Sequence, residues 1–252
     1  MKPERLLAAL AAVPILAMSF AAPASAQATS GLVIAAAPTD AVVIKGLDVE
    51  GLGTTGASSG ITVQSAASVV IDHCVIGGFR SADGVDGNGV FVNNASPTSV
   101  KIQHSLIAHN ANGGVWIKPT GGANAIVAIN DSQIASNGFG VVADGTSTTG
   151  SVNGTVQGTM ISASSQNGVM ASATTAASDI LVLDQVTAIV SGKDGLAASG
   201  ATAELLVGNS TIYGNIAGVV ATNSGSIVSY GNNQLNGNNH ADGAFTATVA
   251  PQ

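Results

Sequence analysis

Eight copies of a six-residue pattern recur along most of the chain, and this repeat constrains the fold more than any other feature. Each copy, called the hexapeptide below, has an apolar residue, two positions that are mostly polar or Gly, a mostly small residue, any residue, and a closing apolar residue. The copies are 44–49 (IKGLDV), 71–76 (IDHCVI), 102–107 (IQHSLI), 129–134 (INDSQI), 156–161 (VQGTMI), 183–189 (LDQVTAI, with one extra residue), 207–212 (VGNSTI) and 230–235 (YGNNQL). They start 23 to 31 residues apart. A period of this length predicts a stacked repeat architecture.

A second column of short strands lies between the hexapeptides, and each of its members begins with glycine. They begin at Gly60 (GITVQ), Gly89 (GVFVN), Gly114 (GVWIK), Gly140 (GVVAD), Gly168 (GVMAS), Gly195 (GLAAS) and Gly218 (GVVAT). Val, Ile and Thr dominate both columns, and no segment has a helical period, so the elements are short β-strands. Asn or Asp recurs ahead of these glycines, at Asn110, Asn137, Asn167, Asp194 and Asn215, and suits a tight corner. We expect an all-β fold, a parallel β-helix of about eight coils.

With these columns, the chain resembles the right-handed parallel β-helix proteins of the pectate-lyase-like superfamily, especially their secreted members. The resemblance covers residues 44–235 and is carried by the GITV, GVFV and GVWI strands and by the IDHCVI, IQHSLI and INDSQI hexapeptides. It implies a right-handed coil, in line with the general handedness of parallel crossovers. It also implies that a sugar-binding groove, where there is one, runs along one of the sheets.

The two ends of the chain differ from the repeats. Residues 1–26 carry Lys2 and Arg5, an apolar run and an Ala-Ser-Ala cleavage site, which is typical of a secretory signal peptide. We therefore expect a secreted or periplasmic protein without a membrane span after cleavage. Residues 27–43 are expected to cap the first coil, with 31–36 (GLVIAA) as a strand across or beside it, and residues 236–252 to cap the last coil.

The charge balance narrows the partners. The chain carries 14 acidic and 7 basic residues, a net charge of −7, and only 8% of its residues are charged. An acidic surface argues against nucleic acid, whose phosphates need a basic face, and against anionic lipid. The one cysteine, Cys74, occupies the small position of its hexapeptide, so we expect a buried thiol with a structural role; the alternative is an intermolecular disulfide or a reactive thiol.

One strand face carries the residues that most resemble a binding surface. Because side chains alternate across a strand, the outward row of the Gly-led strands includes Phe91, Trp116, Val142 and Met170. Lys118 and Asp144 follow in the next outward row. Aromatic faces stack on sugar rings, and the polar pair suits hydroxyls or a uronate carboxylate. These six residues, called the Trp116 face below, are predicted to bind a polysaccharide or another cell-surface component; the alternative is that a loop or a terminal segment covers them.

One corner is longer than the others. Gly89 comes 13 positions after Ile76, about twice the usual distance, and the insert carries Arg80, Asp83 and Asp86 among glycines. One interpretation is a Ca²⁺ or substrate loop, since hard cations take carboxylate and carbonyl oxygens. The other, which the small number of carboxylates favours, is a solvated turn.

The sequence lacks the catalytic patterns of the superfamily. No Gly-His-Gly or Arg-x-Lys segment is present, and no two aspartates fall on adjacent rungs of the Gly-led strands, as a glycosidase would need. His73, His104 and Asp131 share one hexapeptide position and would stack, but the later members of that position indicate a polar corner, so no metal site is expected there. The sequence favours a non-catalytic, exported binding protein. A polysaccharide lyase or epimerase and a purely structural rod are the alternatives.

Overall fold

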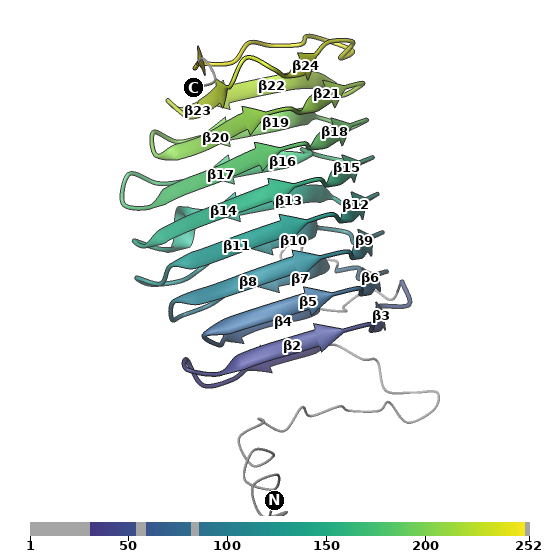
Figure 1. Ribbon diagram of the computed structural model, residues 1–252, viewed down its shortest axis with the longest axis vertical. Helices are drawn as coiled ribbons and strands as arrows, with labels where there is room; N and C mark the ends of the chain where they lie inside the picture. The colour runs from purple at the N-terminus through teal and green to yellow at the C-terminus, as the bar shows by residue number, and fades with distance from the viewer. Residues whose placement is uncertain (1–30, 54–58, 82–85, 250–252) are drawn as a thin grey trace, which may run out of the picture.

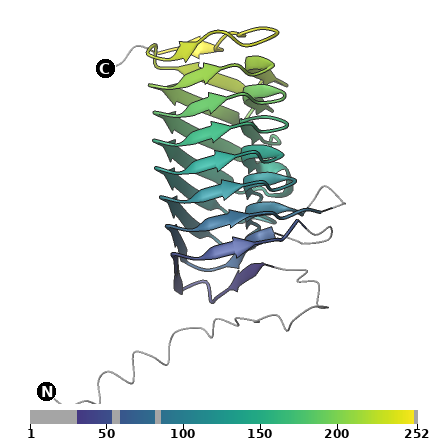
Figure 2. The ribbon, with the colours of Figure 1, turned by 90° about the vertical axis from the view of Figure 1, so that its right-hand side faces the viewer.

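The computed structural model of the protein is a rod of stacked coils (Figure 1). It describes residues 31–53, 59–81 and 86–249. Each coil contributes one strand to each of three parallel sheets, named A, B and C here, and Figure 2 shows these strands stacked along the rod. The predicted all-β solenoid is confirmed. Within the described ranges, no helix is long and apolar enough to cross a membrane.

The strands follow the order A, B, C in each coil. Sheet A contains β1 (Leu32–Ala35), β4 (Ser59–Ser65), β7 (Asn88–Val92), β10 (Gly113–Ile117), β13 (Phe139–Asp144), β16 (Val169–Ser172), β19 (Asp194–Ser199) and β22 (Ala217–Thr222). Sheet B contains β2 (Ala41–Lys45), β5 (Ser68–Asp72), β8 (Thr98–Gln103), β11 (Ala125–Asn130), β14 (Ser151–Gln157), β17 (Ser178–Asp184), β20 (Ala203–Gly208), β23 (Ser226–Ser229) and β25 (Ala247–Thr248). Sheet C contains β3 (Asp48–Glu50), β6 (Val75–Gly77), β9 (Leu106–Ala108), β12 (Gln133–Ala135), β15 (Met160–Ser162), β18 (Thr187–Ile189), β21 (Thr211–Tyr213) and β24 (Gln234–Leu235). One 3₁₀ turn, η1 (Gly145–Ser147), follows β13.

The core is a continuous stack of aliphatic side chains between the three sheets. The inward positions of the Gly-led strands, which alternate with the predicted outward row, are buried, with Val90, Val115 and Val141 fully inaccessible to solvent. Each fully buried isoleucine or valine contributes about 2 kcal/mol through the hydrophobic effect. One coil alone cannot cover these side chains, so the stacking of coils supplies the burial. The second inward row of these strands, which contains Ile117 and Ala143, ends before the last coil, because Ala221 in β22 is exposed.

The structure gives each hexapeptide position a physical role. In the copy 71–76, Ile71 ends the inward row of β5, and Asp72 is the last residue of that strand. His73 then adopts a left-handed conformation with φ 53°, which turns the chain from sheet B into sheet C. Cys74 points inward and Ile76 fills the core from β6. The third position is often Gly, Asn or Asp because these residues tolerate positive φ best.

Two details of the repeat differ from expectation. The copy 183–189 has no extra residue, because Ala188 pairs with Ile161 and takes the closing apolar position, while Ile189 lies one step beyond. The predicted Asn/Asp corner positions belong to two separate columns. Asn110 and Asn137 are hydrogen-bonded to each other after sheet C, whereas Asn167 bonds to Asp194 just ahead of sheet A.

The glycine at the start of each sheet A strand is required by close packing within its coil. A Cβ on Gly140 would lie 2.3 Å from the Ile161 side chain and 2.3 Å from the carbonyl oxygen of Gly168 on the next coil. The same two neighbours, the closing isoleucine of the coil and the next coil's glycine carbonyl, crowd Gly60, Gly89, Gly114 and Gly195. In these coils, the glycine of the Gly-led strand therefore packs directly against the closing isoleucine of the hexapeptide.

Polar groups at the corners form ladders along the rod. The hydroxyl of Ser105 accepts a hydrogen bond from the Cys74 amide at 3.1 Å and donates to the Gln103 carbonyl at 2.8 Å. Ser132 repeats both bonds one coil later. Cys74 takes the same position one coil before Ser105, toward the N-terminal end of this ladder, and its thiol is buried. Buried corner amides are thus satisfied by side chains, as an interior requires.

The ends of the described chain join the sheets. A strand at residues 31–36 was expected across or beside the first coil. β1 lies within this range, pairs parallel with β4 and is the first strand of sheet A. β2 pairs with β5 in sheet B. At the other end, β25 pairs with β23, and Ala241 forms a bridge to Ala217. The predicted signal peptide, residues 1–26, lies outside the described residues.

Candidate functional site

The Trp116 face lies on the outside of sheet A, where four adjacent strands bring its first row into register. Trp116 of β10 pairs with Phe91 of β7 on one side and with Val142 of β13 on the other, and Val142 pairs with Met170 of β16. Neighbouring strands lie about 4.8 Å apart, so these side chains form one line across the sheet. Phe91, Trp116 and Met170 are half-buried and keep part of their surface open to solvent.

The indole of Trp116 is fixed by two contacts. Its ring meets the ring of Phe139 edge-on, with centroids 5.4 Å apart and an angle of 74° between planes. Its Nε1–H donates to Oδ2 of Asp144 at 3.3 Å. Edge-to-face pairs stabilise aromatic clusters, and a buried indole N–H normally needs an acceptor. The ring is therefore held in one orientation before any ligand arrives.

Asp144 is the polar centre of this face. Its Oδ2 also accepts from Lys118 Nζ at 2.8 Å, while Oδ1 accepts from the Thr146 amide at 3.1 Å and from the Thr146 hydroxyl. Burial by itself would raise the pKa of Asp144, but the hydrogen bonds from Lys118 and Thr146 outweigh it and hold the pKa below its ordinary value. A carboxylate in this state orients its neighbours and is a poor general acid.

Val142, one of the six residues predicted for this face, is buried. Val142 is 2% exposed, and it lies in register between Trp116 and Met170. The accessible part of the Trp116 face thus consists of the two aromatic rings, Met170 and the half-exposed Lys118.

The long insert follows β6, at the corner that leads into sheet A. Arg80 is exposed, and Asp86 is half-buried and engaged with other groups. Asp83 lies outside the described residues. The Ca²⁺ interpretation of this insert stays a prediction.

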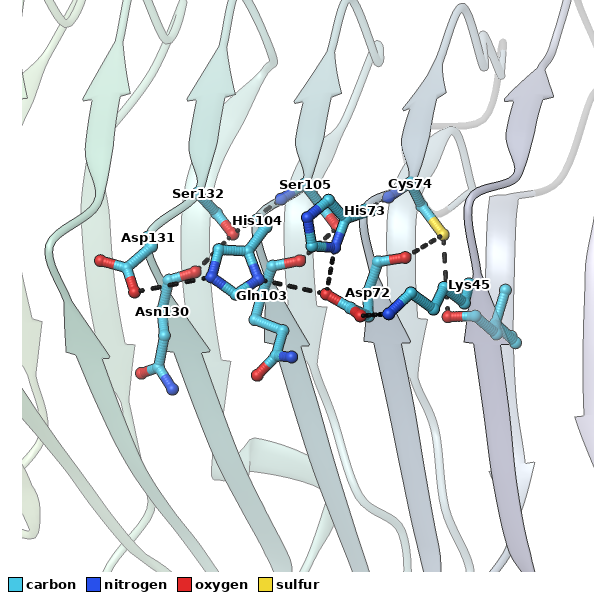
Figure 3. A network of polar contacts seen from close by, with 11 residues as sticks. Lys45, Asp72, His73, Cys74, Gln103, His104, Ser105, Asn130, Asp131 and Ser132 are labelled. Atoms are coloured by element: carbon cyan, nitrogen blue, oxygen red, sulfur yellow. Dashed lines mark hydrogen bonds and ion pairs between the residues drawn. The ribbon is translucent and has the colours of Figure 1, made fainter.

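A second cluster lies on the corner between sheets B and C, near the N-terminal end of the rod (Figure 3). Oδ1 of Asp72 accepts hydrogen bonds from Nδ1 of His73 at 2.6 Å and from Nδ1 of His104 at 3.1 Å. Oδ2 of the same carboxylate lies 2.9 Å from Lys45 Nζ. The two imidazoles lie side by side on successive coils, with centroids 4.7 Å apart and planes 34° from parallel. Asp131, on the third coil, lies 4.0 Å from His104 Nε2.

The two histidines lie at the corner that the sequence predicted, and their rings make contacts that the sequence did not indicate. Lys45, His104 and His73 hold the pKa of Asp72 well below its usual range, and the hydrogen bonds outweigh the effect of burial. The histidines contact this carboxylate, whereas the bonds to backbone come from the next hexapeptide position, for example Ser105. The sequence signal was the shared position of His73 and His104; it did not show that Asp72 lies between them.

No family model matches the chain, and no match was found among curated proteins or solved structures.

Proposed function

We propose that this protein is an exported, non-catalytic β-solenoid that binds a polysaccharide or a related cell-surface glycan on the Trp116 face. The observation that carries the proposal is the orientation of Trp116, whose partly exposed indole is fixed by Asp144 and Phe139 beside a second accessible ring, Phe91. A pre-oriented ring loses little conformational entropy when a flat ligand stacks on it.

The polar groups of the face fit a neutral or acidic sugar. Lys118 is 35% exposed and donates one hydrogen bond to Asp144. Its remaining N–H donors suit a sugar hydroxyl or a uronate carboxylate. The repeat of the rod along its axis, one coil about every 4.8 Å, suits an extended polymer better than a small molecule. Export rests on the signal-peptide features of residues 1–26.

Binding without turnover is favoured over catalysis because the one carboxylate of the face, that of Asp144, already accepts hydrogen bonds from its neighbours. Asp144 accepts from Lys118, Trp116 and Thr146, and its side chain is 9% exposed. A lyase or glycosidase needs a base or acid that is free to exchange a proton with the substrate. A lyase assay with acidic polysaccharides should therefore give no unsaturated product.

The test is affinity electrophoresis of the purified protein in gels that contain neutral or acidic polysaccharides. We expect retardation by at least one polymer, and Trp116→Ala should weaken that binding at least about tenfold, as loss of a central aromatic contact does. Tyr213→Ala is the matched control, because Tyr213 is an aromatic residue 54% exposed on sheet C. Thermal melting of both variants verifies folding.

Two outcomes would count against the proposal. Unchanged retardation of a folded Trp116→Ala protein would place the binding surface elsewhere on the rod. If no polymer in the panel retards the wild-type protein, the result would favour a purely structural rod over a glycan-binding protein.

A further inference from the structure

We propose that Asp72, His73 and His104 form a binding site for a late first-row divalent metal ion such as Zn²⁺, with two imidazole nitrogens and one carboxylate oxygen as ligands. The proposal is independent of the Trp116 face, which lies on sheet A, whereas these residues lie on the corner between sheets B and C.

The backbone places the two histidines together. Both occupy the left-handed corner position of the hexapeptide, with φ 53° for His73 and 48° for His104, on adjacent coils of one parallel stack. The stacking fixes their separation, and both rings project from the rod, 58% and 46% exposed. Their positions are thus set by the main chain, while the rings can still adjust.

The carboxylate of Asp72 is positioned between the imidazoles, and Lys45 binds its other oxygen. Asp72 uses Oδ1 for both Nδ1 atoms and Oδ2 for Lys45, and it is only 9% exposed. Ligand atoms from all three residues lie within 4.8 Å of one another. A metal ion at this point would replace the two N–H···O bonds, and Lys45 would remain as the outer partner that orients the carboxylate.

The ligand set selects the type of ion. Imidazole nitrogen with carboxylate oxygen suits Zn²⁺, Cu²⁺ or Ni²⁺, whereas Ca²⁺ takes oxygen ligands. Zn²⁺ bonds to such ligands are about 2.0–2.2 Å long, and three protein ligands leave one position for water. Because both histidine side chains are exposed, rotation about their side-chain bonds can bring the donor atoms closer to those distances. Asp131 near His104 adds a second carboxylate, which favours a cation at this corner.

The arrangement is specific to these two coils. Later coils carry Gly158, Gln185 and Asn209 at the histidine position, and none of these supplies an imidazole. Among the residues that the structure describes, no other three side chains of His, Cys, Asp or Glu place their ligand atoms within 4.8 Å of one another. Cys74 is not a ligand, because its buried thiol faces the carbonyls of Ile44 and Asp72.

The test is calorimetric titration of the full chain, prepared without a polyhistidine tag, with Zn²⁺ and separately with Ca²⁺. We expect one Zn²⁺ per chain, no comparable Ca²⁺ binding, and visible ligand-field bands when Co²⁺ is used in place of Zn²⁺. His73→Ala and His104→Ala should each weaken binding at least tenfold, and the double variant should abolish it. His109→Ala, a histidine in the left-handed corner after sheet C, is the matched control.

Folding of each variant is checked by thermal melting, and Zn²⁺ should raise the melting temperature of the wild type but not of the double variant. The proposal fails if wild-type protein binds no Zn²⁺. It also fails if the folded double variant still binds one equivalent, or if His109→Ala lowers affinity as much as His73→Ala does.

Discussion

Replacing Gly140 with alanine should destabilise the rod by about 3 kcal/mol, a large effect for one methyl group. The added Cβ would lie 2.3 Å from both the Ile161 side chain and the Gly168 carbonyl oxygen. The second of these is backbone of the next coil, so the clash cannot be relieved by a change of rotamer and must separate two coils. Chemical denaturation of the wild type and the variant measures the difference in unfolding free energy.

Gly122 supplies the matched control for this experiment. It is exposed, and a Cβ there would have Thr149 Oγ1, at 3.7 Å, as its nearest neighbour. Gly122→Ala should therefore change the unfolding free energy by less than about 0.5 kcal/mol. Equal effects of the two substitutions would show that the glycine column is not required by packing.

Asp179→Asn should make the protein more stable at pH 8 and should flatten the dependence of its stability on pH. Asp179 lies near the start of β17 and is fully buried. Its Oδ2 accepts from the Gly145 amide at 2.6 Å, but Oδ1 has no hydrogen-bond partner. Burial, with the nearby charge of Asp144, raises the pKa of Asp179 from 3.8 to about 7.

The sign of the effect follows from proton uptake. Between pH 4 and pH 7 the folded state binds the Asp179 proton more tightly than the unfolded state does, so stability falls as the pH rises through this range. The loss is on the order of 3 kcal/mol for a shift of this size. An uncharged asparagine retains the acceptor for Gly145 and removes the repulsion with Asp144, so the two proteins should differ most at pH 8 and least near pH 4.

Melting curves at several pH values between 4 and 8 test this expectation. Asp131→Asn is the control, because that side chain is 67% exposed and its replacement should leave the wild-type pH dependence in place. A pH dependence that is the same in wild type and Asp179→Asn would mean that Asp179 does not cause it.

The repeat in the sequence predicted the fold because each hexapeptide position has one physical role in every coil. Ile71 and Ile76 mark inward positions, and the alternation that placed Trp116 outside and Val115 inside is correct. The period did not reveal contacts between coils, because those depend on the register of residues about 27 to 32 positions apart. For that reason the carboxylate of Asp72 between His73 and His104 was not predicted.

The Trp116 face was predicted by position but not in its details. Alternation along the strands identified Phe91, Trp116 and Met170 as outward residues, and it could not show that Val142, in the same row, is buried. It also gave Lys118 and Asp144 as a possible ligand-binding pair, whereas the structure shows that Asp144 is occupied in holding Trp116 and Lys118. Asp179 belongs to neither repeated column, so no sequence pattern indicated a buried carboxyl there.

The fluorescence of Trp116 is the most direct measurement of glycan binding on the Trp116 face, because it is the only tryptophan in the chain and its emission reports on that face alone. Titration with a polysaccharide that retards the protein in gels should change the emission in a saturable way, with the same affinity that electrophoresis gives. A polysaccharide that binds the protein and leaves the Trp116 emission unchanged would show that the binding surface lies elsewhere on the rod.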